Sequence, residues 1–127
     1  MKKKILIVAA NYYKDITKKL IFGAIKKISK KNTFKIILVS GAFEIPFVIS
    51  KNIKKYHGFI ALGCVIKGQT PHFDFICKTT FNALMKLSVD KKKPIGNGII
   101  TCLNMSQAKK RSIKKGEEAS NAIFKLI

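Results

Sequence analysis

A chain of 127 residues, 47% of them apolar, is long enough for one domain around a single core, and this composition excludes a disordered protein. No apolar run reaches the roughly 18 residues of a membrane-spanning helix, so we expect no membrane partner. The formal net charge is +20, yet Arg111 is the only arginine among 26 basic residues, and the lysines are spread along the whole chain. Such an extreme ratio of lysine to arginine indicates a coding bias toward A and T. The sequence has no zinc spacing, helix-turn-helix or RNP-like motif, so we expect no specific nucleic-acid partner and only incidental binding at low salt.

The first half of the chain predicts two strands that alternate with two helices. An apolar run at 4–10 predicts a buried strand, and residues 15–29 predict a helix that Asp15 can cap. A second strand is expected at 34–40, followed by a helix over 46–55 with a proline in its first turn. The basic start MKKK precedes only a short apolar run with no small-residue cleavage site, so we expect a cytoplasmic protein without a signal peptide.

The second half continues the alternation. The apolar run at 58–66 predicts a third strand, buried on both faces, and 71–89 predicts a long helix. A fourth strand is expected at 95–102, and a capping-box-like start opens a short helix over 104–112. Lys-Lys-Gly at 114–116 predicts a loop before a last helix.

This order predicts a single α/β domain over 1–127, with a four-stranded parallel sheet and helices on both faces. Ligands of such sheets bind beyond the carboxyl ends of the strands, which fall near Tyr12, 41–44, 67–72 and 102–104. Tyr12 and Tyr13 have rings that can stack on a ligand, although loop tyrosines more often simply pack against the protein.

The turn Gly68-Gln69-Thr70-Pro71 separates the third strand from its helix, with Thr70 as N-cap and Pro71 at the first helical position. Backbone N–H groups at such a helix start form an anion site. His72 follows in the first turn, where the helix N-terminus disfavours its protonated form and a bound phosphate favours it. An ordinary capped helix start and a surface histidine remain the alternative interpretation.

Two further charged residues are candidates for binding. Glu44 lies in the apolar sequence Ala-Phe-Glu-Ile-Pro, where a carboxylate needs hydrogen-bond partners; it is either a helix-N-terminal acid or an acceptor for ligand hydroxyls. Arg111 alone can grip a phosphate with two parallel hydrogen bonds, unless it is an ordinary surface arginine.

The three cysteines, Cys64, Cys77 and Cys102, are odd in number, widely spaced and set in apolar sequence. This pattern predicts reduced cysteines in the core, with neither a disulfide framework nor a metal site.

Three stretches together resemble the lumazine synthase family: SGAFEIP at 40–46, ALGCVIKGQTPHFD at 61–74, and PIGNGIIT followed by QAKKR at 94–111. The resemblance covers nearly the whole chain in the family's order. It implies a flavodoxin-like three-layer α/β sandwich that assembles as homopentamers, in some members as shells of pentamers that enclose riboflavin synthase. The active sites would lie between neighbouring subunits.

The resemblance also implies a reaction in riboflavin biosynthesis. The family condenses 5-amino-6-(ribitylamino)uracil with 3,4-dihydroxy-2-butanone 4-phosphate to form 6,7-dimethyl-8-ribityllumazine, releasing phosphate and water. It uses no cofactor and no metal, so the two small-molecule substrates are the expected ligands.

By this resemblance His72 matches the residue proposed to transfer protons, and Gln69, Thr70 and Arg111 match phosphate-binding positions. The positions that match contacts to the pyrimidine and the ribityl chain are Tyr12, Ala42, Phe43, Glu44, Cys64, Val65, Ile66, Asn97 and Lys115. Among all these residues, Asn97, Arg111 and Lys115 match positions that the adjacent subunit supplies.

Three departures from the family pattern accompany these matches. Asn97 stands where many members carry phenylalanine, and Lys67 stands where an arginine is common. The segment between Arg111 and Lys115 is several residues shorter than in many members.

Overall fold

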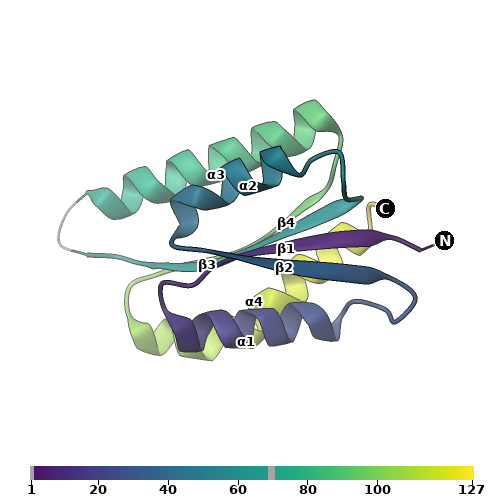
Figure 1. Ribbon diagram of the computed structural model, residues 1–127. Helices are drawn as coiled ribbons and strands as arrows, with labels where there is room; N and C mark the ends of the chain where they lie inside the picture. The colour runs from purple at the N-terminus through teal and green to yellow at the C-terminus, as the bar shows by residue number, and fades with distance from the viewer. Residues whose placement is uncertain (1, 69–70) are drawn as a thin grey trace.

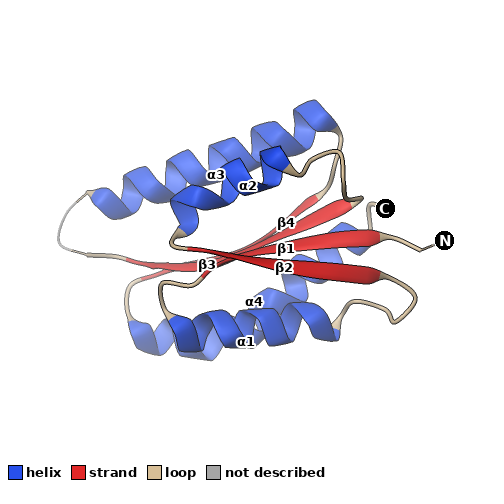
Figure 2. Cartoon of the chain, viewed as in Figure 1, coloured by secondary structure: helices blue, strands red, loops and turns tan. Residues whose placement is uncertain are grey.

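The computed structural model describes residues 2–68 and 71–127, and these ranges form one parallel sheet between two layers of helices (Figures 1 and 2). The strands are β1 (Lys4–Ala10), β2 (Thr33–Val39), β3 (Gly58–Ile66) and β4 (Ile95–Cys102), in the order β2-β1-β3-β4. The helices are α1 (Lys14–Lys26), the 3₁₀ turn η1 (Ala42–Glu44), α2 (Ile45–Lys51), α3 (His72–Lys91) and α4 (Met105–Phe124). Helices α1 and α4 cover one face and α2 and α3 the other, which confirms the predicted fold class.

The strands lie close to their predicted positions, and the helix ends differ more. Helix α1 begins after Tyr13 and ends at Lys26, so Asp15 lies in its first turn and does not cap it. Helix α2 ends at Lys51, four residues earlier than expected. None of the helices in the described ranges combines the length and hydropathy that crossing a membrane requires.

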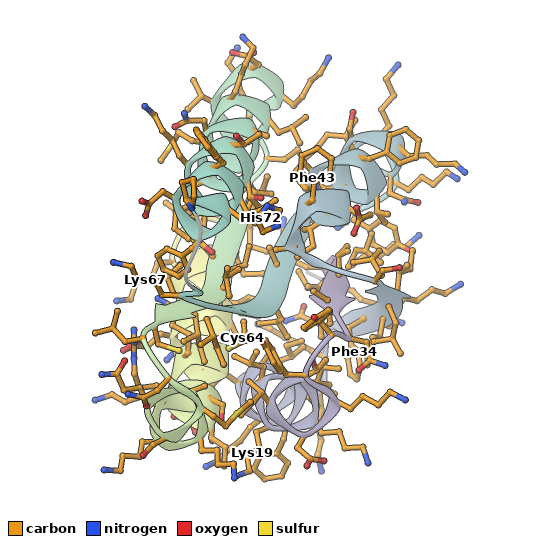
Figure 3. The ribbon with its side chains drawn as sticks, turned by 90° about the vertical axis from the view of Figure 1, so that its left-hand side faces the viewer. Lys19, Phe34, Phe43, Cys64, Lys67 and His72 are labelled. Carbon is orange, nitrogen blue, oxygen red and sulfur yellow. The ribbon has the colours of Figure 1, made fainter. Side chains whose placement is uncertain are left out.

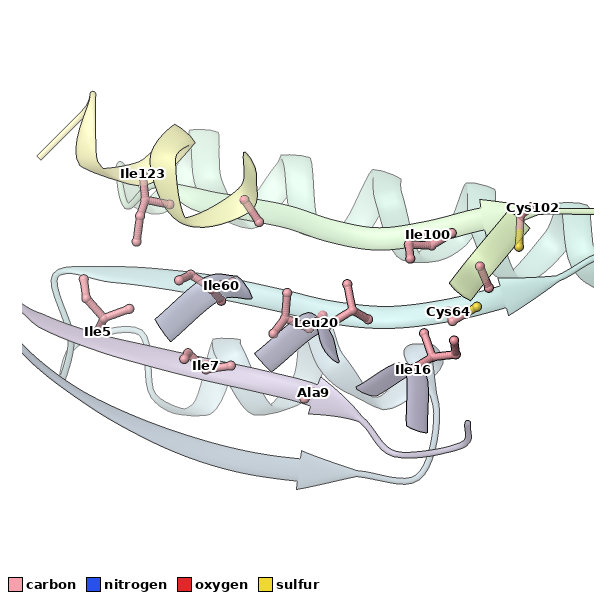
Figure 4. Packing of buried hydrophobic residues seen from close by; sticks show 14 residues of the cluster. Ile5, Ile7, Ala9, Ile16, Leu20, Ile60, Cys64, Ile100, Cys102 and Ile123 are labelled. Atoms are coloured by element: carbon pink, nitrogen blue, oxygen red, sulfur yellow. The ribbon is translucent and has the colours of Figure 1, made fainter. Parts of the chain in front are cut away.

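The core consists of two apolar clusters, one on each face of the sheet (Figure 4 shows the first). Strand β1 from Ile5 to Ala10 and the first seven residues of β3 are buried, as their apolar runs predicted. Strand β2 differs because it is the edge of the sheet: Phe34, Ile36 and Leu38 are 38%, 39% and 54% exposed. The β1 residues that pair with them belong to the apolar cluster between the sheet and helices α1 and α4. These three side chains therefore lie on the same face of the sheet, beyond the helices that cover it.

The predicted loop at 114–116 is wrong, because α4 continues through it as one helix. Gly116 is the contact point of two helix backbones: a Cβ at this position would lie 2.1 Å from the carbonyl oxygen of Leu20 in α1. Gly23 in α1 has the same relation to the carbonyl oxygen of Ile113. These glycines therefore allow the close approach of α1 and α4, whereas the sequence pattern at 114–116 predicted a loop between two helices. The start of α4 is as predicted, since Asn104 Oδ1 accepts a hydrogen bond from the Gln107 N–H at 2.9 Å.

This packing predicts that Gly116→Ala destabilises the protein by about 2–3 kcal/mol, the usual cost of overpacking a close contact. In an ordinary helix the same substitution stabilises by about 1 kcal/mol, so the sign of the change separates the two situations. Urea unfolding followed by circular dichroism measures it. Gly68→Ala is the matched control, because no atom lies within 4 Å of its added Cβ and its stability should change little. A Gly116→Ala variant as stable as the parent would contradict the close contact.

Candidate active site

A cleft of about 710 Å³ opens at the carboxyl ends of the strands, on the side where η1 and the start of α3 rise above the sheet (Figure 3). This volume is typical of pockets that bind small molecules. The residues that line it come from the segments after β1 and β2, from the end of β3 and from the first turns of α3: Tyr12, Tyr13, Gly41, Ala42, Phe43, Glu44, Cys64, Val65, Ile66, His72 and Ile76. Because all strands are parallel, segments far apart in the sequence meet at this one edge.

Eight residues that the sequence analysis singled out line this cleft, namely Tyr12, Ala42, Phe43, Glu44, Cys64, Val65, Ile66 and His72. Tyr13, whose ring was also considered for stacking, and Gly41, in the predicted strand-end segment 41–44, line the cleft as well. Ile76 was missed; it lies one helical turn after His72. The i,i+4 spacing on α3 is the signal that could have identified Ile76.

Aromatic side chains form the open side of the cleft. Tyr12 is 73% exposed and Phe43 is 59% exposed. The Tyr12 ring meets that of Tyr13 edge-on, with 4.8 Å between centroids and an interplanar angle of 81°. Burial raises the pKa of the Tyr13 hydroxyl, so this group stays neutral at ordinary pH. The faces of Tyr12 and Phe43 are available to a planar ring or to another protein surface.

Glu44 is exposed, in contrast to the apolar setting that its sequence neighbours suggested. Its Oε1 accepts a hydrogen bond of 2.9 Å from the Gly41 N–H across the first turn of η1. This is the helix-N-terminal role that the sequence left open, and it fixes the direction of the carboxylate at the cleft. A carboxylate has further acceptor positions, so this contact does not use up its capacity to bind hydroxyl groups.

Cys64 and Cys102 lie side by side near the ends of β3 and β4, as Figure 4 shows. Burial raises the pKa of the Cys64 thiol, the neighbouring Cys102 raises it further, and Arg111 opposes the shift. Cys102 donates a hydrogen bond from Sγ to the carbonyl oxygen of Asn104 at 3.3 Å. Both cysteines are therefore reduced core residues, as predicted, whereas Cys77 is half-buried on α3. Within the described ranges, no three His, Cys, Asp or Glu side chains form a group that could hold a metal ion.

The predicted anion turn is described only at its two ends. Gln69 and Thr70, which the sequence identified as phosphate-binding, lie outside the described residues. Strand β3 reaches Ile66 and α3 begins at His72, so Pro71 precedes the helix by one residue. His72 is the first helical residue and lines the cleft (Figure 3). The start of α3 thus lies at the carboxyl edge of the sheet, where a helix N-terminus favours an anion.

Asn97, Arg111 and Lys115 do not line the cleft of their own chain. Asn97 is exposed on β4, and its Oδ1 accepts a hydrogen bond from the Ile99 N–H at 3.0 Å. Arg111 is exposed on α4 and donates from Nη1 to the carbonyl oxygen of Thr101 at 3.3 Å. Lys115 is half-buried one turn later on the same helix. All three lie on β4 and α4.

Comparison with known proteins gives a consistent result. The sequence model of the 6,7-dimethyl-8-ribityllumazine synthase family matches residues 2–127. The 6,7-dimethyl-8-ribityllumazine synthase of Bartonella tribocorum is 42% identical over an alignment that covers 100% of this chain and 91% of that protein. The protein of the same name from Bartonella henselae is 41% identical, with 99% and 87% covered, and that from Nitratidesulfovibrio vulgaris is 35% identical, with 98% and 86% covered. A crystal structure of phosphotransferase system component EIIA from Streptococcus agalactiae covers 100% of this chain and 95% of that chain at 15% identity, with a TM-score of 0.35, too low to indicate a common fold.

Proposed function

The chain belongs to the 6,7-dimethyl-8-ribityllumazine synthase family, and we propose that the cleft at the carboxyl ends of its strands is the active site of this transferase. The enzyme acts in riboflavin biosynthesis, where it condenses 5-amino-6-(ribitylamino)uracil with 3,4-dihydroxy-2-butanone 4-phosphate and releases phosphate and water. The observation that carries the assignment of the site is the meeting of Tyr12, Glu44 and His72, from three distant segments, around one cleft of about 710 Å³.

Within this cleft the pyrimidine substrate has a matching surface. The exposed ring of Tyr12 stacks on the heterocycle, and the backbone at the end of β3, from Cys64 to Ile66, binds its polar edge. The ribityl chain follows η1, where the Glu44 carboxylate, oriented by the Gly41 N–H, accepts hydrogen bonds from the ribityl hydroxyls. The high pKa of the Cys64 thiol keeps a negative charge out of this wall of the cleft.

The phosphorylated ketone binds at the start of α3. Gln69 and Thr70 provide the phosphate turn in this proposal, and Arg111 of a second copy supplies the bidentate contact. The phosphate would then lie beside His72, which moves protons between the amine and the ketone during the condensation. Most of the catalysis comes from holding the two substrates together, since positioning can contribute about 7–11 kcal/mol and one proton-transfer residue about 10²–10⁴-fold in rate.

A second copy of the chain completes the site in this proposal. Several large apolar side chains are exposed, among them Phe34, Ile36 and Leu38 on the edge strand β2 and Phe75, Met85 and Val89 on α3. Exposed apolar surface of this extent is typical of an interface between subunits. We propose a cytoplasmic homopentamer; a shell of pentamers and an enclosed riboflavin synthase are extensions of the same proposal.

The central test is to mix the purified protein with both substrates and to follow the absorbance and fluorescence of the lumazine product. We expect His72→Ala to lower kcat by about 10²-fold, and by no more than about 10⁴-fold, because positioning is retained. His57→Gln is the matched control, since His57 lies at the opposite end of the strands, and its kcat should stay within about twofold of the parent. A His72→Ala enzyme with full activity would remove His72 from the mechanism.

Arg111→Ala should chiefly raise the KM for the phosphorylated ketone, by about tenfold or more, because a charge-assisted bidentate contact to phosphate is lost. The KM for the pyrimidine substrate serves as the internal control and should change little. Arg111→Lys should recover only part of the loss, since an ammonium group cannot make the paired contact. An unchanged KM for the ketone would contradict the role of Arg111.

Co-assembly of the two variants tests whether the site is shared between subunits. In a ring with heterologous contacts, co-expressed His72→Ala and Arg111→Ala chains form about a quarter of their sites from one intact His72 and one intact Arg111. We therefore expect kcat/KM of the mixed assembly to exceed that of either variant and to approach a quarter of the parent value. If both residues served the same site from one chain, mixing would give only the average of the two variants.

A further inference from the structure

The lysines look dispersed along the sequence, but the fold gathers about half of them at the end of the sheet opposite the cleft. Four stretches of chain pass this end: 2–4 (KKK), 26–31 (KKISKK), 54–55 (KK) and 91–93 (KKK). Twelve of their fourteen residues are lysines and none is acidic. We call this surface the lysine face. It lies at the end of the molecule where Figure 1 marks the two chain termini.

Hydrogen bonds join these four stretches into one continuous surface. The Lys3 N–H donates to Asn32 Oδ1 at 2.9 Å, next to the stretch 26–31. The Lys4 N–H donates to His57 Nδ1 at 2.9 Å, next to 54–55. Lys93 Nζ donates to the carbonyl oxygen of Tyr56 at 2.7 Å. The stretches therefore follow the strand order across the edge of the sheet, with 26–31 at one side and 91–93 at the other.

Neither coding bias nor the helix dipoles explain this concentration. A coding bias raises the lysine content everywhere, whereas here twelve of the fourteen positions in these four stretches are lysine. The dipoles favour cations only within the last turn of a helix, which accounts for Lys26 and Lys91 but not for the lysines at 2–4, 30–31 or 54–55. In the described part of the chain, two of the six acids form ion pairs, Glu117 with Lys26 at 3.2 Å and Asp90 with Lys86 at 3.1 Å, and these leave most of the face uncompensated.

His57 reports the resulting positive field. This half-buried histidine precedes β3 at the lysine face. Burial lowers its pKa below the usual value, and the charges of Lys3, Lys93 and Lys4 lower it further. The neutral form is also the one whose Nδ1 can accept the Lys4 N–H.

We propose that the lysine face binds nucleic acid through the phosphate backbone, without reading the base sequence. A row of ammonium groups matches a polymer of phosphates, and release of its counterions drives binding. Because the face holds no arginine, it lacks the rigid guanidinium fork for paired contacts to guanine. Flexible lysines contact phosphates without reading sequence, so sequence preference is not expected. An anionic membrane fits less well, since stable membrane attachment needs an apolar anchor as well as charge. The only apolar residue in the four stretches, Ile28, packs against the core.

The cleft and the lysine face are separated by the length of the strands, roughly 25 Å, so nucleic acid bound at this face leaves the cleft open. Nucleic-acid binding at the lysine face does not depend on the proposed active site. Loss of nucleic-acid binding with intact lumazine formation, or the reverse, would identify which of the two proposals has failed.

The test compares two variants of equal net charge. The face variant carries Lys→Gln at 27, 30, 31, 54 and 55, and the control variant carries Lys→Gln at 18, 19, 78, 109 and 110, on exposed positions of α1, α3 and α4. Anisotropy of a fluorescein-labelled 20-base-pair DNA duplex of mixed sequence is measured between 50 and 200 mM salt. We expect the face variant to bind at least tenfold more weakly than the parent at 50 mM, with a shallower dependence of log K on log salt. The control variant should stay within about threefold of the parent.

A second readout locates the bound DNA. NMR titration of the imidazole protons should show the pKa of His57 rising toward its usual value when the duplex is present, because phosphates offset the lysine charges. An equal loss of affinity in both variants would overturn the proposal, since net charge alone would then decide binding. A Kd above about 100 μM for the parent at 150 mM salt, an unchanged pKa of His57, or tighter binding to vesicles with 30% phosphatidylserine than to the duplex would each overturn it as well.

Discussion

The burial of β1 and β3 between two helical layers is the constraint on which the rest of the structure depends. Both strands are apolar on both faces, so they are stable only at the centre of a sheet that helices cover on each side. Parallel strands in turn place every carboxyl end at one edge and every amino end at the other. The polar segments that cannot enter the core are therefore sorted into two groups. The cleft forms at one edge and the lysine face at the other.

The edges of the same sheet support the proposal that one copy of the chain is an incomplete unit. On the edge strand β2, the apolar residues Phe34, Ile36 and Leu38 stay exposed. At the other edge, Asn97 does not line the cleft of its own chain, and neither does Arg111 on α4; both side chains form hydrogen bonds with the backbone of their own chain. In the proposed ring of copies, each neighbour would cover exposed apolar surface and bring a second set of polar groups to each cleft. These two edges support the proposal that the active site lies between subunits.

Much of this arrangement could be predicted from the sequence, and the failures have physical causes. Long apolar runs identified all four strands. The stretches GAFEIP and ALGCVIKGQTPHFD contain seven of the eight predicted residues that line the cleft, and the family resemblance added Tyr12. Gly116 was misread because a glycine that permits close helix packing has the same local pattern as one that ends a helix. The gathering of the lysines depends on contacts between distant segments, which local patterns do not contain. The sequence showed lysines everywhere, and only the sheet order showed which of them are neighbours.

The distance between the two edges also decides what the high net charge can do for catalysis. At physiological ionic strength a charge is screened within about 8 Å, and the lysine face lies roughly 25 Å from the cleft. Its field therefore does not attract the phosphorylated substrate into the site. Local groups must capture that phosphate, and in the proposed site the start of α3 together with Arg111 of a second copy would be sufficient for a single dianion. The lysine face and the solitary arginine would thus serve separate purposes: the first is a charged surface at one end of the fold, and the second is proposed to make a directional contact at the other.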